Sequence, residues 1–565
     1  MTAMKQRAVG TLDEFDCEVL RNYFLAVVRE MVAVTSRAAY STVFSEALDF
    51  SCALFDEQDR MYAQEGGLAV HVGGLVDVLK AIRSAYPAMS PGDVFVHNDP
   101  YNGGSHTADV AVAVPVFAGG DYVGMAINRG HWLDIGSFAA GGWAGAYTHA
   151  VQEGLCLPPV RLVASGMLNE EVRAIITANI RVPEESMGDL DAQIASCRAA
   201  ERRILEAVER YGLDGYLTTL EYIMKYSRRR LQAAIAELPV GVFEGSDVLE
   251  DDGQGNGPFN LTARVVIDSG RIIVDLRDAS PQGAGPANGS WGVVKAAVYT
   301  ALKSILDPEM PLDSAIDEFV SIQLTPCTWV SPVYPAPVFA STGEPANRVC
   351  EAILNGLADA VPSRAMAYSY AAGINVTGRG VNPRTGEEFV FYCFGPGGNG
   401  ARAYADGEAA MWHIMGSCRN ESIELWEQRF PFRFTRFALL PDSGGAGKFR
   451  GGLGYVKEFE VLADVDVNAY QDRHRRGAPG ICGGDDGAPN AIMFRIDEVW
   501  GTAVDHFATK SSSKFTAVPV KCGSLISMVA GGGGGYGELG ERAPEASKRD
   551  VEFRYVTGQS DQGGE

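Results

Sequence analysis

Four glycine-rich strings in the second half of the chain constrain its fold more than any other feature of the sequence. They read GPGGNGAR, PDSGGAGKFRGGLG, GICGGDDGAP and GGGGGYG, and all lie beyond residue 380, in a chain with 66 glycines. Each string is bordered by apolar segments that read as strands, which is not typical of a flexible linker. Because glycine has no Cβ, it allows tight turns and close approach of one backbone to another. The sequence therefore predicts a closely packed C-terminal region that contains β-structure.

The spacing of apolar residues predicts both helices and strands in the rest of the chain. Helical periods run over residues 12–45, 71–86, 189–238 and 293–306, and strand patterns run over residues 49–66, 94–131 and 240–280. The longest helical period is interrupted near Gly212 and Gly215. No internal repeat at a fixed period is visible.

This mixture predicts an α+β fold with several domains. We expect an N-terminal region over residues 1–240 with long helices, a central α/β region over 241–380, and a glycine-rich, β-containing region over 381–565. A length of 565 residues suits two or more domains.

Composition excludes several classes of partner. The net charge of −23 argues against nucleic acid and against an anionic membrane surface, because both require basic patches. No apolar run is long enough for a transmembrane helix, and the N-terminus lacks the apolar core of a secretory signal. The ten cysteines are spread along the chain without a CxxC motif, which indicates reduced thiols and a cytoplasmic location.

A cluster of histidines and acids is the strongest candidate for a functional site. His106-x-x-Asp109 lies in the string HNDPYNGGSHTADV, and His131 follows 25 residues later in GHWLDIG. A strand pair between them would bring His131 back beside the first two residues. Two imidazoles and one carboxylate suit a catalytic divalent ion such as zinc, manganese or iron. The alternative is that these are hydrogen-bonded loop histidines, but five of the eight histidines fall within one segment of 79 residues.

Several long strings resemble the B-component of the hydantoinase/oxoprolinase family. That family includes N-methylhydantoinase, 5-oxoprolinase and caprolactamase, and it is related to subunits of acetone and acetophenone carboxylases. The strings are HNDPYNGGSHTADV, GHWLDIG, VQEGLCLPPVRL, SEALDFSCALFD, MPLDSAIDEFVSI and ELWEQRFPFRFTRFALLPDSGGAGKFRGGLG, and the resemblance spans nearly the whole chain. The chain departs from the family pattern at Ala47, Asp313 and Ala315, which leaves the identity of the substrate open.

The resemblance implies roles for individual residues. It places the divalent ion on His106, Asp109 and His131. It places an acidic group, here Glu46, beside the same centre as a proton shuttle, although Glu46 is equally interpretable as a helix-end carboxylate. Asp134 is interpreted as a catalytic-site residue that orients His131 or completes the metal sphere. Asp49 and His71 are interpreted as supports of the site through hydrogen bonds.

The resemblance also implies the activity. In family members an ATP-binding A-component with an actin-like kinase fold phosphorylates the substrate carbonyl, and the B-component acts on the activated intermediate. No glycine string here has the Gly-x-x-x-x-Gly-Lys-Ser/Thr form of a phosphate-binding loop, so ATP is expected on the partner subunit. We therefore expect a hetero-oligomeric, ATP-dependent hydrolase of a small cyclic amide such as a lactam, hydantoin or oxoproline. A ketone carboxylase subunit and a non-catalytic scaffold are the alternatives, and the chain length favours the hydrolase.

Overall fold

The computed structural model describes residues 12–65 and 67–557. The first eleven residues, on which part of the interpretation of the N-terminus rests, lie outside the described residues. The predicted α+β fold is confirmed: within the described part, the strands form four separate sheets, and helices pack between and around them. None of the described helices combines the length and the apolar character that crossing a membrane requires.

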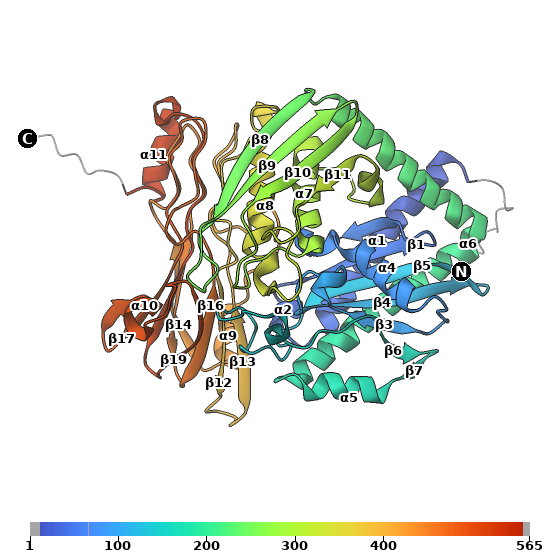
Figure 1. The fold of residues 1–565 in the computed structure, drawn as a ribbon, viewed down its shortest axis with the longest axis horizontal. Helices are drawn as coiled ribbons and strands as arrows, with labels where there is room; N and C mark the ends of the chain where they lie inside the picture. The colour runs from blue at the N-terminus through green and yellow to red at the C-terminus, as the bar shows by residue number, and fades with distance from the viewer. Residues whose placement is uncertain (1–11, 66, 558–565) are drawn as a thin grey trace, which may run out of the picture.

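A seven-stranded sheet forms the centre of the N-terminal region, at the blue end of the colour range in Figure 1. Its order is β2-β1-β5-β4-β3-β6-β7. The strands are β1 (Phe50–Asp56), β2 (Met61–Glu65), β3 (Val94–His97), β4 (Asp109–Ala118), β5 (Asp121–His131), β6 (Val160–Ala164) and β7 (Met167–Leu168). The helices of this region are α1 (Glu14–Ala38), α2 (Thr42–Ser45), α3 (Ala69–Val72), α4 (Leu75–Ala85), α5 (Glu170–Ala178) and α6 (Pro183–Ala236).

The long helix α6 packs against α1 and against strands β4 and β5. It is broken where the sequence indicated, because Gly212 has a positive φ of 75° that a helix cannot continue through. The predicted single helix over residues 12–45 is wrong in one respect, since α1 ends at Ala38 and α2 begins after Ser41. The carboxylate of Asp189 accepts hydrogen bonds from the backbone N–H groups of Tyr40 and Ser41, at 2.9 and 3.1 Å, and fixes the turn between them.

The central region is a four-stranded sheet with two helices beside it. The sheet order is β11-β10-β9-β8, and β11 runs parallel to β10. The strands are β8 (Gly241–Leu249), β9 (Phe259–Asp268), β10 (Arg271–Ala279) and β11 (Val320–Gln323), and the helices are α7 (Trp291–Leu306) and α8 (Glu344–Gly356). Helix α8 packs on β8 and β9 and against α7, which contacts α3 of the N-terminal region. The two buried helices α7 and α8 thus link this sheet to the seven-stranded sheet of the N-terminal region.

Two further sheets make up the C-terminal region, drawn orange to red in Figure 1. Their orders are β13-β12-β16-β19 and β14-β15-β20-β17-β18. The strands are β12 (Asn375–Val381), β13 (Glu388–Cys393), β14 (Phe432–Leu439), β15 (Tyr455–Val461), β16 (Val465–Tyr470), β17 (Ala491–Ile496), β18 (Val499–Gly501), β19 (Lys514–Val520) and β20 (Leu525–Val529), and the helices are α9 (Ile423–Arg429), α10 (Ala503–Phe507) and α11 (Pro544–Glu552). The predicted boundary after residue 380 falls inside β12, and the division into three domains stays a prediction.

The glycine strings bond to one another across this region, as the sequence predicted. The N–H of Gly533 donates to the carbonyl of Gly452, and the carbonyl of Gly533 accepts from the N–H of Gly445, both at 2.9 Å. A Cβ on Gly533 would lie only 1.9 Å from the carbonyl oxygen of Asn399. Close approach of backbones therefore excludes any side chain at this position.

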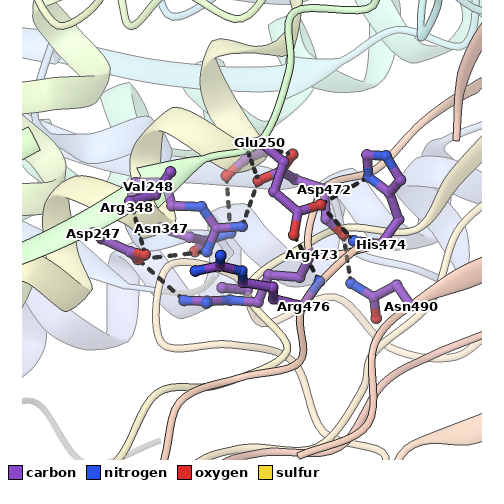
Figure 2. A network of polar contacts seen from close by, with 12 residues as sticks. Asp247, Val248, Glu250, Asn347, Arg348, Asp472, Arg473, His474, Arg476 and Asn490 are labelled. Atoms are coloured by element: carbon purple, nitrogen blue, oxygen red, sulfur yellow. Dashed lines mark hydrogen bonds and ion pairs between the residues drawn. The ribbon is translucent and has the colours of Figure 1, made fainter. Parts of the chain in front are cut away.

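A buried network of charged side chains joins the central and C-terminal regions (Figure 2). Asp472 forms ion pairs with Arg348 of α8, at 2.9 Å, and with Lys514 at the start of β19, at 2.6 Å. Arg473 forms an ion pair with Glu351 of α8 at 2.6 Å. All five side chains are almost completely buried, so each charge depends on its partners for solvation.

Candidate metal centre

The β4–β5 hairpin brings together the three residues that the sequence proposed as metal ligands. Asp109 begins β4 and His131 ends β5, and the two are direct partners in the antiparallel register. His106 lies in the turn before β4, with its Nε2 2.8 Å from Oδ1 of Asp109 and 3.1 Å from Nδ1 of His131. Nδ1 of His131 lies 3.3 Å from the same Oδ1. All three side chains are buried.

The orientation of His106 points a lone pair at this group. Its Nδ1 lies 2.8 Å from the backbone carbonyl of Phe339. A carbonyl accepts, so Nδ1 donates, and the Nε2 of the neutral ring carries a lone pair. That lone pair faces a carboxylate oxygen and a second imidazole nitrogen. These three atoms are positioned so that they can hold a cation between them.

Two further residues complete the cluster, and both come from other elements. The Nε2 of His71, on α3, lies 3.2 Å from Oδ2 of Asp109 and 3.6 Å from Oδ1 of Asp49, which directly precedes β1. The guanidinium of Arg129 donates to the backbone carbonyl of His71 at 2.9 Å and so holds α3 beside the hairpin. The sequence interpretation of Asp49 and His71 as neighbours of the site agrees with these contacts.

Electrostatics keep Asp109 ionised. Burial acts to raise the pKa of Asp109, but His106 and His71 beside it hold the pKa well below the usual value of an aspartate. For Asp49, burial dominates over the histidines and raises the pKa. The centre therefore combines one firmly charged carboxylate with imidazole side chains, a set of residues that zinc, manganese and iron all accept as ligands.

The cluster borders a small cavity, and some buried polar atoms of the described lining residues have no partners. The cavity measures about 30 Å³, and the residues that line it include Asp49, His71, Asp109, His131, Trp143, Asn375, Tyr392, Trp412, His413 and Cys418. Within the described chain, the Nε2 of His131 and the Oδ1 of Asp49 have no hydrogen-bond partner although both are buried. A metal ion with an open coordination position facing this cavity fits the donor set. The Nε2 of His131 and the Oδ1 of Asp49 lie outside that donor set and remain available to a further polar group.

A second, larger cavity adjoins the small one and shares part of its lining. It measures about 550 Å³ and shares Trp412, His413 and Gly416 with the small cavity. The Nδ1 of His413 accepts from the N–H of Met415 at 3.1 Å, and burial together with Arg348 lowers the pKa of His413 to about 3. His413 is therefore a neutral imidazole whose remaining ring nitrogen carries the proton.

The two proposed catalytic carboxylates lie outside the cluster. Glu46 is the C-cap of α2 and is half-buried, and it does not line the small cavity, whereas Asp49 does. Asp134 forms an ion pair with Arg181 at 2.8 Å, and its Oδ2 accepts from the backbone N–H groups of Gly136 and Arg181. These contacts orient the loop after β5 and the start of α6. The catalytic roles of Glu46 and Asp134 stay predictions.

Sequence reasoning missed the aromatic and C-terminal wall of the site. Trp143 stacks on His131 with ring centroids 6.3 Å apart, and Tyr392 of β13 approaches the same imidazole at 5.2 Å. Tyr392 and His413 lie more than 200 residues from the hairpin in sequence, and no local pattern connects them to it. Of these residues, only Trp143 could have been found from the sequence, because it lies in the unusual string GHWLDIGSFAAGGW.

A second group with metal-type ligands, formed by Glu250, Asp472 and His474, is part of the buried network in Figure 2. Here Arg348 and Lys514 already supply positive charge to Asp472. This group is satisfied by cations of the protein, in contrast to the first cluster.

Comparison with known proteins places the chain in a family. The family model for hydantoinase B/oxoprolinase matches residues 13–539. The chain belongs to this family. The resemblance inferred from the sequence strings is thereby confirmed.

The relatives differ in how much of their own length this chain covers. The caprolactamase subunit beta of Pseudomonas jessenii is 31% identical over 94% of this chain and 92% of its own. The crystal structure of the ATP-dependent caprolactamase from Pseudomonas jessenii has a TM-score of 0.90 at 29% identity, covering 97% of this chain and 95% of the other. The 5-oxoprolinase 1 of Arabidopsis thaliana is 26% identical over 95% of this chain, which spans 43% of that protein. An acetone carboxylase structure has a TM-score of 0.87 at 19% identity, over 96% of this chain and 78% of that one, which shows a shared fold.

Proposed function

We propose that this chain is the metal-holding subunit of an ATP-dependent hydrolase of small cyclic amides. The observation that carries the proposal is the convergence of His106 Nε2, His131 Nδ1 and Asp109 Oδ1 beside a cavity with unpartnered polar atoms. Membership of the hydantoinase B/oxoprolinase family and the likeness to a caprolactamase support the class of substrate. Within that class, a lactam, a hydantoin and an oxoproline are all candidates.

In this proposal His106, Asp109 and His131 hold a zinc, manganese or iron ion. Such an ion supplies a water of lowered pKa and polarises a carbonyl oxygen. His71 holds the carboxylate of Asp109 in place, and Phe339 fixes the ring of His106 through its backbone carbonyl. This arrangement keeps the donor atoms aimed at one point and excludes bulk water from it.

Two carboxyl groups are candidates for moving the proton that hydrolysis transfers to the leaving nitrogen. Glu46 is implied by the resemblance to the family. Asp49 is supported by geometry, because it lines the cavity, has an unpartnered Oδ1, and has a pKa raised by burial. A carboxyl with a raised pKa exchanges protons more readily near neutral pH. The variants Asp49→Asn and Glu46→Gln distinguish between the two candidates, because each variant removes one of the two carboxyl groups.

ATP enters this proposal through a partner subunit with an actin-like kinase fold. Relatives are named as subunits, among them the caprolactamase subunit beta. The partner would phosphorylate the amide, and this chain would act on the activated intermediate in a hetero-oligomer. A cytoplasmic location remains part of the proposal.

The test is co-expression with the kinase-like partner, followed by metal analysis and by assays with ε-caprolactam, hydantoin and 5-oxoproline. We expect one equivalent of divalent metal per chain and substrate-stimulated ATP cleavage coupled to ring opening. His106→Ala and His131→Ala should both abolish metal binding. The control is His149→Ala, which changes the N-cap residue of a short 3-10 helix and should leave metal binding intact. Full metal content in both variants would contradict the proposal.

A ketone carboxylase subunit is the second candidate, because an acetone carboxylase shares the fold. ATP cleavage that depends on a ketone and bicarbonate, with no response to the three cyclic amides, would favour it. If the protein contains no metal and the activity of the complex survives His106→Ala, this chain would instead be a non-catalytic scaffold.

A further inference from the structure

Two tryptophans at the small cavity have buried indole N–H groups without an acceptor. Within the part of the chain that the structure describes, the Nε1 atoms of Trp143 and Trp412 are buried and have no hydrogen-bond partner, and both residues line the cavity. An indole nitrogen can only donate. Leaving such a donor unpaired costs about 1–3 kcal/mol, so two of them in one cavity require an explanation.

Other buried tryptophans of the protein do not share this property. The Nε1 of Trp132 donates to Gln193 at 3.0 Å, that of Trp329 donates to the carbonyl of Asn260 at 3.0 Å, and that of Trp426 donates to Glu421 at 2.6 Å. The fold therefore provides acceptors for indoles elsewhere. The two unpaired donors coincide with the candidate metal centre.

Trp143 is the closer of the two to the proposed ligands. Its ring stacks on that of His131 with an interplanar angle of 18°, and its centroid lies 5.8 Å from that of His106. The far edge of its six-membered ring packs on Gly343, where a Cβ would lie 3.2 Å from Cζ3. The indole is thus held rigidly beside the cluster by contacts that leave its N–H unpaired.

We propose that Trp143, together with Trp412, donates hydrogen bonds to an anionic oxygen of the ligand held at the His106–Asp109–His131 centre. This inference rests on the proposed function and identifies the ligand group as the oxygen that water adds to the phosphorylated carbonyl carbon. That oxygen gains negative charge as it loses its proton during the addition. Donors fixed in advance, in a site that excludes water, stabilise such charge strongly. Trp143 is then a catalytic residue that touches the substrate.

The chemistry of the cavity supports an oxygen anion over other ligands. The lining combines the candidate cation site with two residues whose N–H donors are unpaired, so the complementary group is one that accepts hydrogen bonds and binds a cation. A volume of about 30 Å³ accommodates one small group. A carboxylate oxygen or the water-derived oxygen of the addition intermediate meets these requirements, whereas an ammonium group or an apolar group does not.

Formate is the probe for this inference, because it is a carboxylate small enough for the cavity. The full chain is loaded with Co²⁺, and formate is titrated while the visible absorption of the cobalt is followed. In the Trp143→Phe variant, which keeps the ring and removes the N–H, we expect formate affinity to fall by about 10-fold, the value of one hydrogen bond to a charged group. Cobalt affinity should be unchanged.

Trp329→Phe is the matched control, because Trp329 is equally buried but its N–H has a protein acceptor. It should leave formate affinity unchanged and should lower the melting temperature, since it removes one of the two hydrogen bonds that the carbonyl of Asn260 accepts, from Trp329 and from the N–H of Ser280. Trp143→Phe should not lower the melting temperature of the ligand-free chain through a lost hydrogen bond. Should Trp143→Phe fail to fold, Trp412→Phe serves as the second variant, with the same expected loss of formate affinity.

The outcomes separate this inference from the proposed function. Cobalt-loaded Trp143→Phe and Trp412→Phe variants that both bind formate as tightly as the wild type would overturn the inference and leave the metal centre standing. A wild-type chain that takes up no divalent metal would overturn the proposed function itself. In the complex with the partner, Trp143→Phe should lower kcat for ring opening while the KM for the cyclic amide stays the same.

Discussion

His474 should make the stability of this protein fall as the pH rises above neutrality. It lies in the buried network of Figure 2, with Nδ1 3.0 Å from Oε2 of Glu250 and Nε2 3.2 Å from Oδ2 of Asp251. Burial acts to lower its pKa, but the interactions with Asp251 and Glu250 outweigh burial and raise the pKa to about 9. The side chain is only 5% exposed, so solvent screens these interactions little.

The magnitude follows from linkage between protonation and folding. The pKa rises from 6.5 in the unfolded chain to about 9 in the folded one. At about 1.4 kcal/mol per pH unit, this difference corresponds to about 3 kcal/mol of stability. Because the folded pKa is the higher one, this contribution is fully present below pH 6.5 and is lost as the pH rises through 9.

The perturbation is His474→Gln, and the measurement is the free energy of unfolding in urea at pH 6, 8 and 10. The difference between wild type and variant should be largest at pH 6 and should shrink by about 3 kcal/mol by pH 10. His506→Gln, on α10 and outside this network, is the control for loss of a histidine. A difference between wild type and His474→Gln that stays constant from pH 6 to pH 10 would refute the reasoning.

Three further predictions concern the proton shuttle, the glycine packing and the nucleotide. If Glu46 transfers the proton, the Glu46→Gln variant should keep the metal and should keep substrate-stimulated ATP cleavage in the complex. Ring opening, measured by product analysis, should fall by about 100-fold. Unchanged coupling of ATP cleavage to ring opening would show that Glu46 is only a helix-end carboxylate. Gly533→Ala should destabilise the fold by about 3 kcal/mol or more in a urea titration, because its Cβ would clash with the carbonyl of Asn399, whereas Gly540→Ala, with open space around it, should have little effect. The isolated chain should show no micromolar binding of ATP by calorimetry, and such binding would contradict the assignment of ATP to the partner.

Local patterns determined much of this fold and one part of the site. Apolar spacing located the long helices and the hairpins, and Gly212 marked the break in α6, because these features depend on neighbours within one or two turns. The meeting of Asp109 with His131 also followed from local sequence. Two apolar strands joined by a short turn must pair antiparallel, and that pairing places the ends of the hairpin together.

The contacts that side chains from distant elements make were decided by the tertiary structure. Asp49 and His71 joined the cluster because β1 pairs with β5 and because Arg129 holds the backbone of α3 beside the hairpin. Asp134 bonded to Arg181 rather than to His131, since α6 begins beside that loop. The partner of the Asp134 carboxylate depends on which charged side chain the fold places beside it. The spacing of residues in the sequence does not contain this information.

The sequence by itself thus determined the family, the hairpin that carries the proposed ligands and the need for close glycine packing. The tertiary structure decided the wall of the cavity, where Trp143 and Tyr392 approach His131 from segments that the sequence does not connect. The physical reason is the range of the interactions involved. Periodicity and turn chemistry act between residues a few positions apart, whereas packing of a cavity wall depends on how whole sheets and helices settle against one another.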